Sequence, residues 1–237
     1  DRFYGNNDVM GPVQAAKHGT HVSGLIGAQR DNGIGIDGVA DNVKIMMLRI
    51  VPDGDEYDKD VALAIRYAVD NGASVINMSF GKYFSPEKQW VDSAIQYAAS
   101  KDVLLVHSSG NENNNVDEKE NFPNQWPKPG NKKAANFINV GASSDPKISG
   151  SITAEFSNYG KKNVDVFAPG VRIYSTFPGG NKYGNLKGTS MAAPIVTGLA
   201  ALIRSYYPDL TAIQVKKVIE ESVLKPDATV FNIKPGS

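Results

Sequence analysis

Residues 187–204 read KGTSMAAPIVTGLAALIR, and this stretch decides the fold because it specifies a buried helix with an unusual beginning. Ser190 stands where the first backbone N–H groups of a helix have no intrahelical partner and the positive end of the helix dipole lies. Pro194 is tolerated close to such an end. The hydroxyl of Thr189 or Ser190 is therefore either an N-cap or a nucleophile whose oxyanion those free N–H groups would stabilise. The apolar side chains recur at the period of one buried helix face, at Met191, Ala192, Ile195, Val196, Leu199, Leu202 and Ile203.

The composition predicts a single domain over residues 1–237, with residues 225–237 as a C-terminal tail. The chain is 41% hydrophobic, which is enough to bury one sizeable core. Lys and Arg number 25 and Asp and Glu number 25, so nothing indicates a nucleic-acid or anionic-membrane partner. The absence of cysteine excludes a disulfide framework and a thiol nucleophile. No apolar stretch is long enough to cross a membrane. The chain starts with neither methionine nor a signal peptide, so we expect a mature form or a piece of a longer protein.

Short apolar runs alternate with amphipathic helical stretches, which is the pattern of a parallel sheet covered on both faces. We therefore predict an α/β fold of three layers, with a mostly parallel sheet between helices. A polar stretch, residues 111–136, is predicted to be a surface loop. The predicted strands are 43–51, 74–79, 103–107, 137–142 and 164–168, and the predicted helices are 18–28, 58–70, 87–99, 190–206 and 211–223.

Small, glycine-bearing turns follow two of the predicted strands. Functional groups of open parallel sheets gather at the carboxyl ends of the strands, so these turns are candidate binding positions. Glycine lets the backbone of a ligand approach closely. The turns are Ser79-Phe80-Gly81 after the second strand and Ser108-Ser109-Gly110-Asn111 after the third.

Only three histidines could serve as a general base. His18 stands at the start of a helix that faces the edge of the sheet, which favours a reactive role. His21 lies one turn on and is expected to pack, and His107, at the end of an apolar strand, is expected to be a satisfied core residue. A metal site at His18 and His21 is not favoured, because the pair lacks the Glu and the i,i+4 spacing of the zincin helix.

Three stretches, HGTHVSG at 18–24, SSGN at 108–111 and GTSMAAP at 188–194, together resemble the subtilisin-like serine proteases, the subtilases. The resemblance implies that His18 is the general base, Ser190 the nucleophile and Asn111 the side-chain donor of the oxyanion hole. It further implies that the main chain of the substrate is held as an added strand by Ser79-Phe80-Gly81. The walls of the protein's primary specificity pocket would be formed by Ser79, Phe80, Gly81, Ser108, Ser109 and Gly110. We expect the His18 imidazole and the Ser190 hydroxyl to share one cleft.

A catalytic triad also needs a carboxylate to orient the imidazole, and in the subtilisin order this aspartate precedes the histidine. Only Asp1 and Asp8 precede His18, and neither closes an apolar strand as the family pattern requires. We therefore expect a catalytic domain that lacks its N-terminal segment, with the triad aspartate upstream. This chain alone should be a poor peptidase, and a sheet without an inner strand should leave exposed edges that favour self-association.

The resemblance also bears on cofactors, partners and location. No cofactor is required for catalysis, but the loop DNGIGIDG at 31–38 binds calcium in some subtilases. Asp31, Asn32 and Asp37 offer suitable oxygens there, although a plain turn is the favoured explanation of the loop. The expected partners are a polypeptide substrate and an inhibitory propeptide, and the expected location is secreted or in the cell envelope.

Two other functions compete with an endopeptidase. The first is a catalytically silent domain that keeps the peptide-binding groove; a decayed site would be expected to lose Ser190, His18 or Asn111, and all three are present. The second is an esterase of the α/β-hydrolase type. That class needs Gly-x-Ser-x-Gly and a histidine after the serine, and no histidine follows Ser190.

Overall fold

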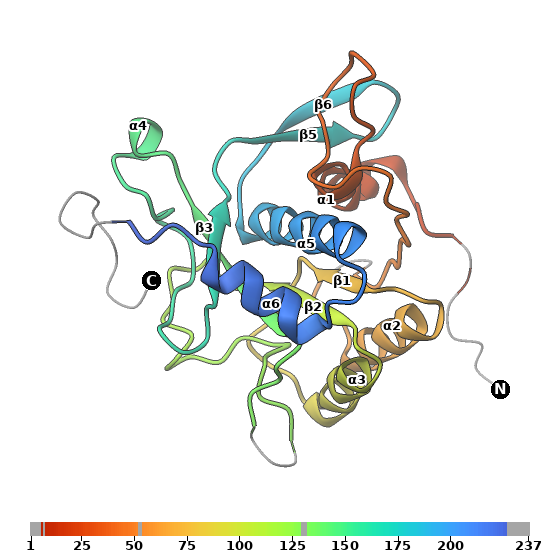
Figure 1. Cartoon of the computed structure of the whole chain (residues 1–237), viewed down its shortest axis with the longest axis vertical. Coiled ribbons are helices and arrows are strands. Elements are labelled where there is room, and N and C mark those ends of the chain that lie inside the picture. The colour runs from red at the N-terminus through yellow and green to blue at the C-terminus, as the bar shows by residue number, and fades with distance from the viewer. Residues whose placement is uncertain (1–5, 7, 52–53, 129–131, 227–237) are drawn as a thin grey trace.

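The computed structural model describes residues 6, 8–51, 54–128 and 132–226, and a four-stranded parallel sheet lies at its centre (Figure 1). The strands are rich in Val, Ile and Leu and are almost wholly buried in the middle of the sheet, as expected for parallel strands covered on both faces. Met78, His107 and Asn139 lie side by side in register, so the carboxyl ends of neighbouring strands meet at one edge. The order across the sheet is β1 (Val75–Met78), β2 (Leu104–Ser108), β3 (Phe137–Ser143) and β4 (Val166–Pro169).

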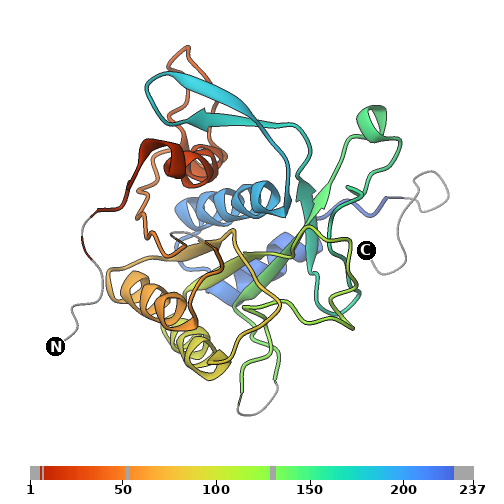
Figure 2. The same ribbon diagram turned by 180° about the vertical axis from the view of Figure 1, so that it is seen from behind.

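Helices cover both faces of this sheet (Figures 1 and 2). Successive side chains of a strand point to opposite faces, so Leu105 packs with α2 and α3, whereas Leu104 and Val106 pack with α5 and α6. The predicted three-layer α/β fold is therefore confirmed. The helices on the first face are α2 (Asp58–Asp70) and α3 (Lys88–Ser100), and those on the second are α5 (Thr189–Tyr206) and α6 (Ala212–Glu221).

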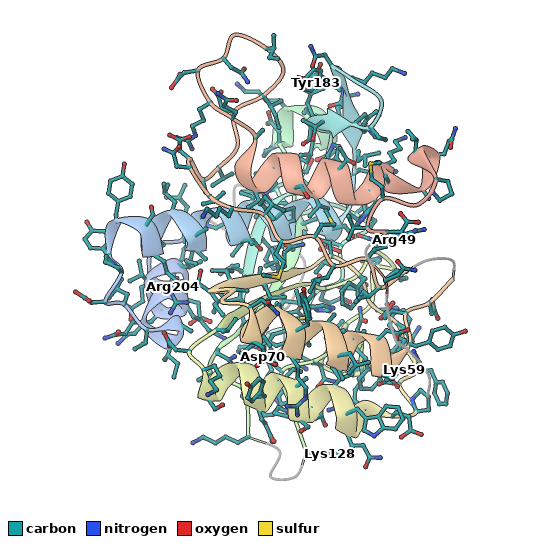
Figure 3. The ribbon with its side chains drawn as sticks, turned by 90° about the vertical axis from the view of Figure 1, so that its right-hand side faces the viewer. Arg49, Lys59, Asp70, Lys128, Tyr183 and Arg204 are labelled. Carbon is teal, nitrogen blue, oxygen red and sulfur yellow. The ribbon has the colours of Figure 1, made fainter. Side chains whose placement is uncertain are left out.

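A further helix and a hairpin lie over α5, on its side away from the sheet (Figure 3). The 3₁₀ turn η1 (Val13–Ala16) leads into α1 (Lys17–Gly27), whose apolar side packs against Met191 of α5. The antiparallel hairpin of β5 (Ile173–Phe177) and β6 (Lys182–Leu186) contacts α1. A one-turn helix, α4 (Pro146–Ser149), completes the elements.

Residues 43–51 correct the predicted strand pattern. Four of the five predicted strands form, but this segment, although apolar, belongs to no strand. Among the described residues, no backbone hydrogen bond joins it to a neighbour. Val43 and Ile50 pack against the core, while Ile45, Met46 and Met47 are exposed. An apolar run needs a hydrogen-bonding neighbour to become a strand. None of the described strands pairs with residues 43–51.

Two other regions differ from the sequence-based expectation. The hairpin of β5 and β6 was not predicted, although PGGN at 178–181 between β-branched and aromatic residues is a hairpin signal. Residues 111–136 are not merely a surface loop, because Val116, Asn121 and Gln125 are buried in it. Of the predicted tail, only residues 225–226 lie within the described part of the chain. None of the helices that the structure describes is both long and apolar enough to cross a membrane.

Candidate active site

Ser190 lies in the first turn of α5, at the edge of the sheet where β1 and β2 end. The N-cap is Gly188, with φ 146°, so neither Thr189 nor Ser190 caps the helix. The Ser190 hydroxyl donates a hydrogen bond to the backbone oxygen of Ser79, 3.2 Å away. Both hydroxyl-bearing residues are therefore inside the first turn, where backbone N–H groups lack helical partners and favour a developing negative charge.

Pro194 changes the hydrogen bonding of this first turn of α5. Without an N–H, it cannot donate the helical bond to the carbonyl four residues earlier, which is that of Ser190. The Ser190 carbonyl accepts a hydrogen bond from the Ser79 hydroxyl instead, at 2.9 Å. Two reciprocal bonds thus join Ser190 to the turn that follows β1. The proline allows this contact, which holds the start of α5 against the predicted substrate-binding turn.

The side chain of Asn111 points to the residue next to Ser190. Its Oδ1 accepts hydrogen bonds from the backbone N–H of Thr189 at 2.8 Å and from the Thr189 hydroxyl at 3.1 Å. The Gly110 N–H donates to the same hydroxyl, at 3.1 Å. These bonds fix the oxygen end of the amide on α5, and its Nδ2 has no partner among the described residues. The donor end is thus available beside the start of α5, as an oxyanion donor requires.

His18 is the second residue of α1, and the packing of α1 on α5 determines where it lies. The two helices run in the same direction (Figure 3), and a Cβ built on Gly198 would lie 3.3 Å from the carbonyl oxygen of Ile26. His18 and Ser190 each precede that contact by eight residues, so the geometry places both at the same end of the helix pair. Their side chains form no hydrogen bond in the structure, because the Ser190 hydroxyl donates to Ser79.

The surroundings of the His18 imidazole favour its neutral form. Although much of the residue is accessible to solvent, the protein around the ring desolvates it and lowers its pKa below the usual 6.5, and the charge of nearby His21 lowers that pKa further. The neutral imidazole is the form that can accept a proton as a general base.

The other two histidines have structural partners, as predicted. His21 is fully buried, and its Nε2–H donates to the carbonyl oxygens of Ile173 and Gly184, at 3.0 and 3.2 Å, which attaches the hairpin to α1. His107 is also buried, and its Nε2–H donates to the Phe80 carbonyl at 2.8 Å. Burial lowers the pKa of His107 to about 4, so its ring is neutral at pH 7.

The two glycine-bearing turns meet at the start of α5. The first, Ser79-Phe80-Gly81, is bonded to Ser190 as described, and the Asn77 amide donates to the Ser79 hydroxyl at 2.9 Å. The second, Ser108-Ser109-Gly110, reaches α5 through Gly110. The structure thus brings Ser79 and Gly110, one residue from each turn, to the start of α5.

No carboxylate in the described part of the chain is hydrogen-bonded to His18. Asp8, in an exposed stretch before η1, accepts a hydrogen bond from the Gly11 N–H at 2.8 Å. Asp1 lies outside the described residues. The described residues therefore include the predicted nucleophile, oxyanion donor and base, but no carboxylate bonded to the predicted base.

The loop at 31–38 is closed by its own side chains. Oδ1 of Asp37 accepts from the Asp31 N–H at 3.3 Å, and Oδ1 of Asn32 accepts from the Ile34 N–H at 3.0 Å. Throughout the described ranges, no group of three or more His, Cys, Asp or Glu side chains is arranged to hold a metal ion. One side-chain oxygen of Asp37 and one of Asn32 are therefore engaged in turn formation within the loop.

Sequence reasoning missed three residues beside the site. Asn158 is fully buried and bonded to the Gly110–Asn114 loop, together with Tyr83 and Glu112. Asn158 lies in FSNYG at 156–160, between two polar or aromatic neighbours and far from the three motifs that carry the family resemblance. A buried asparagine between a buried serine and a tyrosine has no period or spacing that reveals its partners in advance.

Comparison with known proteins agrees with this geometry. The chain is 37% identical over 227 residues to a thermophilic serine proteinase of Bacillus sp. (strain AK1), an alignment that covers 95% of this chain and 51% of the relative. It is 38% identical over 203 residues to subtilisin DY of Bacillus licheniformis, covering 84% of this chain and 67% of that protein. The chain thus spans about half the length of the first of these relatives and two thirds of the second.

Solved structures give the same result. A protease from Pseudoalteromonas arctica matches with a TM-score of 0.74 and 31% identity, over 88% of this chain and 64% of that one. A cold-adapted subtilisin-like serine proteinase matches with a TM-score of 0.70 and 31% identity, over 86% of this chain and 67% of that one. The model of the subtilase family matches residues 4–233. By fold and sequence, the chain belongs to the subtilase family.

Proposed function

We propose that this chain forms most of the catalytic domain of a serine endopeptidase. In the reaction, His18 accepts the proton of the Ser190 hydroxyl while Ser190 Oγ attacks the carbonyl carbon of a peptide bond. The negative charge that develops on the carbonyl oxygen is met by the Asn111 amide and the Ser190 N–H. The imidazolium then protonates the leaving amine. Water hydrolyses the acyl-enzyme by the same steps, with His18 again as the base.

The observation that carries this proposal is the attachment of Asn111 to Thr189. The amide oxygen is bound to the start of α5, so the amide nitrogen is left for a ligand beside Ser190. A catalytically silent peptide-binding domain would have no use for a free donor fixed at this point. The substrate is a polypeptide held along Ser79-Phe80-Gly81, and the family supports a secreted or cell-envelope location.

We propose further that the carboxylate that orients His18 precedes Asp1 in the full-length protein, on a strand that lies between the open side of β1 and residues 43–51. The support is the unpaired apolar segment at 43–51 and the engagement of Asp8 with Gly11. Without a carboxylate, an imidazole is neither held in one tautomer nor stabilised when protonated. The open side of β1 would also let copies of the short chain associate. An inhibitory propeptide would bind separately, over the cleft beside His18 and Ser190.

The test is casein hydrolysis by this chain and by the full-length protein, with Ser190→Ala in each as the blank. A fluorophosphonate probe, which reacts with activated serines, should label full-length protein at Ser190 and label this chain far more slowly. If neither is labelled or active while both are folded, the protein is a silent binding domain. If the short chain equals the full-length protein, another residue orients His18.

A further inference from the structure

The loop that carries Asn111 is irregular, and something outside it must hold its shape. Gly110 has φ +102° and Asn113 has φ +56°, both in the left-handed region. No strand or helix lies between β2 and the bridge at Asn115. An oxyanion donor works by standing in a fixed position before the charge develops. The position of Asn111 therefore depends on whatever fixes residues 109–114.

The side chain of Asn158 bonds to this loop at both of its ends. Its Nδ2 donates to the carbonyl oxygen of Ser109 at 2.7 Å and lies 3.1 Å from Oε2 of Glu112. Its Oδ1 accepts from the N–H groups of Glu112 at 3.1 Å and Asn114 at 2.9 Å. The backbone N–H of Asn158 also donates to the Gly110 carbonyl, at 3.0 Å. One buried residue thus bonds to the loop both before and after Asn111.

Glu112 and Tyr83 extend this contact to Asn111 itself and to the substrate-binding turn. Oε2 of Glu112 accepts from the backbone N–H of Asn111 at 2.9 Å, and the Tyr83 hydroxyl donates to the same oxygen. The Asn158 amide donates to the Tyr83 hydroxyl at 3.0 Å. Tyr83 lies two residues beyond Gly81, so the network joins the turn after β1 to the loop after β2.

The space around Asn158 leaves little freedom for the loop to shift. A Cβ on Gly110 would lie only 2.2 Å from Nδ2 of Asn158 and 2.7 Å from Nδ2 of Asn121. Asn158 itself has no exposed surface. An amide packed this tightly, with five polar partners, is costly to displace, because the Ser109 carbonyl and the N–H groups of Glu112 and Asn114 would each lose a hydrogen bond.

We propose that Asn158 is a positioning residue for catalysis, which sets the oxyanion donor Asn111 through its bonds to Ser109, Glu112 and Asn114, with Tyr83 as the link to the substrate-binding turn. The inference rests on the proposed function, because it assigns Asn158 a role through Asn111. A misplacement of about 1 Å can cost roughly a hundredfold in rate. Loss of Asn158 should therefore act on turnover rather than on substrate binding.

The experiment measures kcat, KM and the free energy of unfolding of the full-length protein and its variants. Asn158→Ala should lower kcat at least tenfold and change KM by less than about twofold. Asn136→Ala is the matched control: Asn136 is a buried asparagine whose amide donates to the Val103 carbonyl at 2.8 Å, at the opposite edge of the sheet. It should lose stability but keep kcat.

A double-variant comparison separates positioning from general damage. If Asn158 acts through Asn111, then in an Asn111→Ala background Asn158→Ala should reduce kcat less than about threefold further. The inference is overturned if the kcat reductions of the two single variants multiply in the double variant. It is also overturned if Asn158→Ala folds and keeps the wild-type kcat.

If Asn158→Ala does not fold, Tyr83→Phe provides the test, because this variant removes only the hydroxyl that bonds to Glu112 and Asn158. Tyr83→Phe should lower kcat several-fold. An unchanged kcat in Tyr83→Phe would also overturn the inference. Failure of the proposed function looks different, since Asn111→Ala and Ser190→Ala would then have no effect either.

Discussion

The two sides of the candidate cleft are held together to very different degrees. On the oxyanion side, Asn158, Glu112 and Tyr83 bond to the loop that bears Asn111 and to one another. On the side of the base, residues 43–51 lie beside α1 with no backbone partner in the described chain. They border an open groove of about 510 Å³, whose lining includes Gly24, Ile45, Met47, Phe177 and Tyr183.

This difference shows that the two halves of the candidate site are held in place by separate parts of the chain. Ser190 and Asn111, the proposed nucleophile and oxyanion donor, are held by hydrogen bonds to the turn after β1 and to the start of α5. His18, the proposed base, lies on α1, which packs against α5 and the hairpin. We therefore expect perturbations on the first side to be large and specific, and those along 43–51 to be small.

The largest effect is expected for Ser190→Ala in the full-length protein. Removal of the nucleophile should lower kcat by about 10⁶, the figure that applies to the corresponding serine of subtilisin. Ser205→Ala makes the same chemical change at the exposed end of α5, where the hydroxyl only donates to the Leu202 carbonyl. It should leave casein hydrolysis unchanged. Activity in Ser190→Ala above the blank would remove Ser190 as the nucleophile.

The next effect in size is that of Asn111→Ala. We expect kcat to fall by about a hundred- to a thousandfold, the loss that follows removal of such a donor in subtilisin, carried over to this chain by family. KM should change little, because the contact strengthens only as the oxyanion forms. Asn115→Ala, further along the same loop, is the control and should be neutral for kcat. A loss confined to KM would place Asn111 in substrate binding instead.

The middle of the sheet and the start of α5 could be predicted from sequence, because their determinants are local. Apolar runs such as 103–107 and the helical period of 190–206 identify strand and helix without knowledge of the partner. Segment 43–51 shows the limit of that reasoning. It has the composition of a strand, but strand formation depends on a neighbouring strand, which no local pattern reveals.

The site shows the same limit. His18, Ser190 and Asn111 are recognisable because each stands in a short motif at the end of an element. Asn158 is distant in sequence from all three, and its role arises from contacts across 44 to 49 positions. Long-range hydrogen bonds of this kind leave no periodic signal, so they become visible only in three dimensions.

A smaller effect concerns pH and the core below the substrate-binding turn. His107 is buried with a pKa of about 4, against 6.5 for an accessible histidine. Between these values the unfolded chain binds more protons than the folded one, so the free energy of unfolding should fall as pH decreases from about 6.5 to 4, by a few kcal/mol at most. Urea unfolding at pH 7 and at about pH 4.5, within that window, measures this. In His107→Gln, which keeps a donor for Phe80 but cannot titrate, the fall should be smaller, and an identical fall would assign it to other groups.

The smallest effect is expected at Met46, on the exposed side of 43–51. In this chain Met46 is 41% exposed and its segment forms no ladder, so Met46→Ser should change the free energy of unfolding by no more than about 0.5 kcal/mol. Leu105→Ala, in fully buried β2, should cost about 2–5 kcal/mol in the same urea titration.

The same Met46 substitution in the full-length protein tests whether an upstream strand covers this segment. If an upstream strand covers 43–51 there, Met46 becomes buried, and the same substitution should cost on the order of 1–3 kcal/mol because apolar area removed from water is lost. Equal and small losses in both proteins would mean that nothing covers the segment, and the strand proposed to carry the orienting carboxylate would have to lie elsewhere.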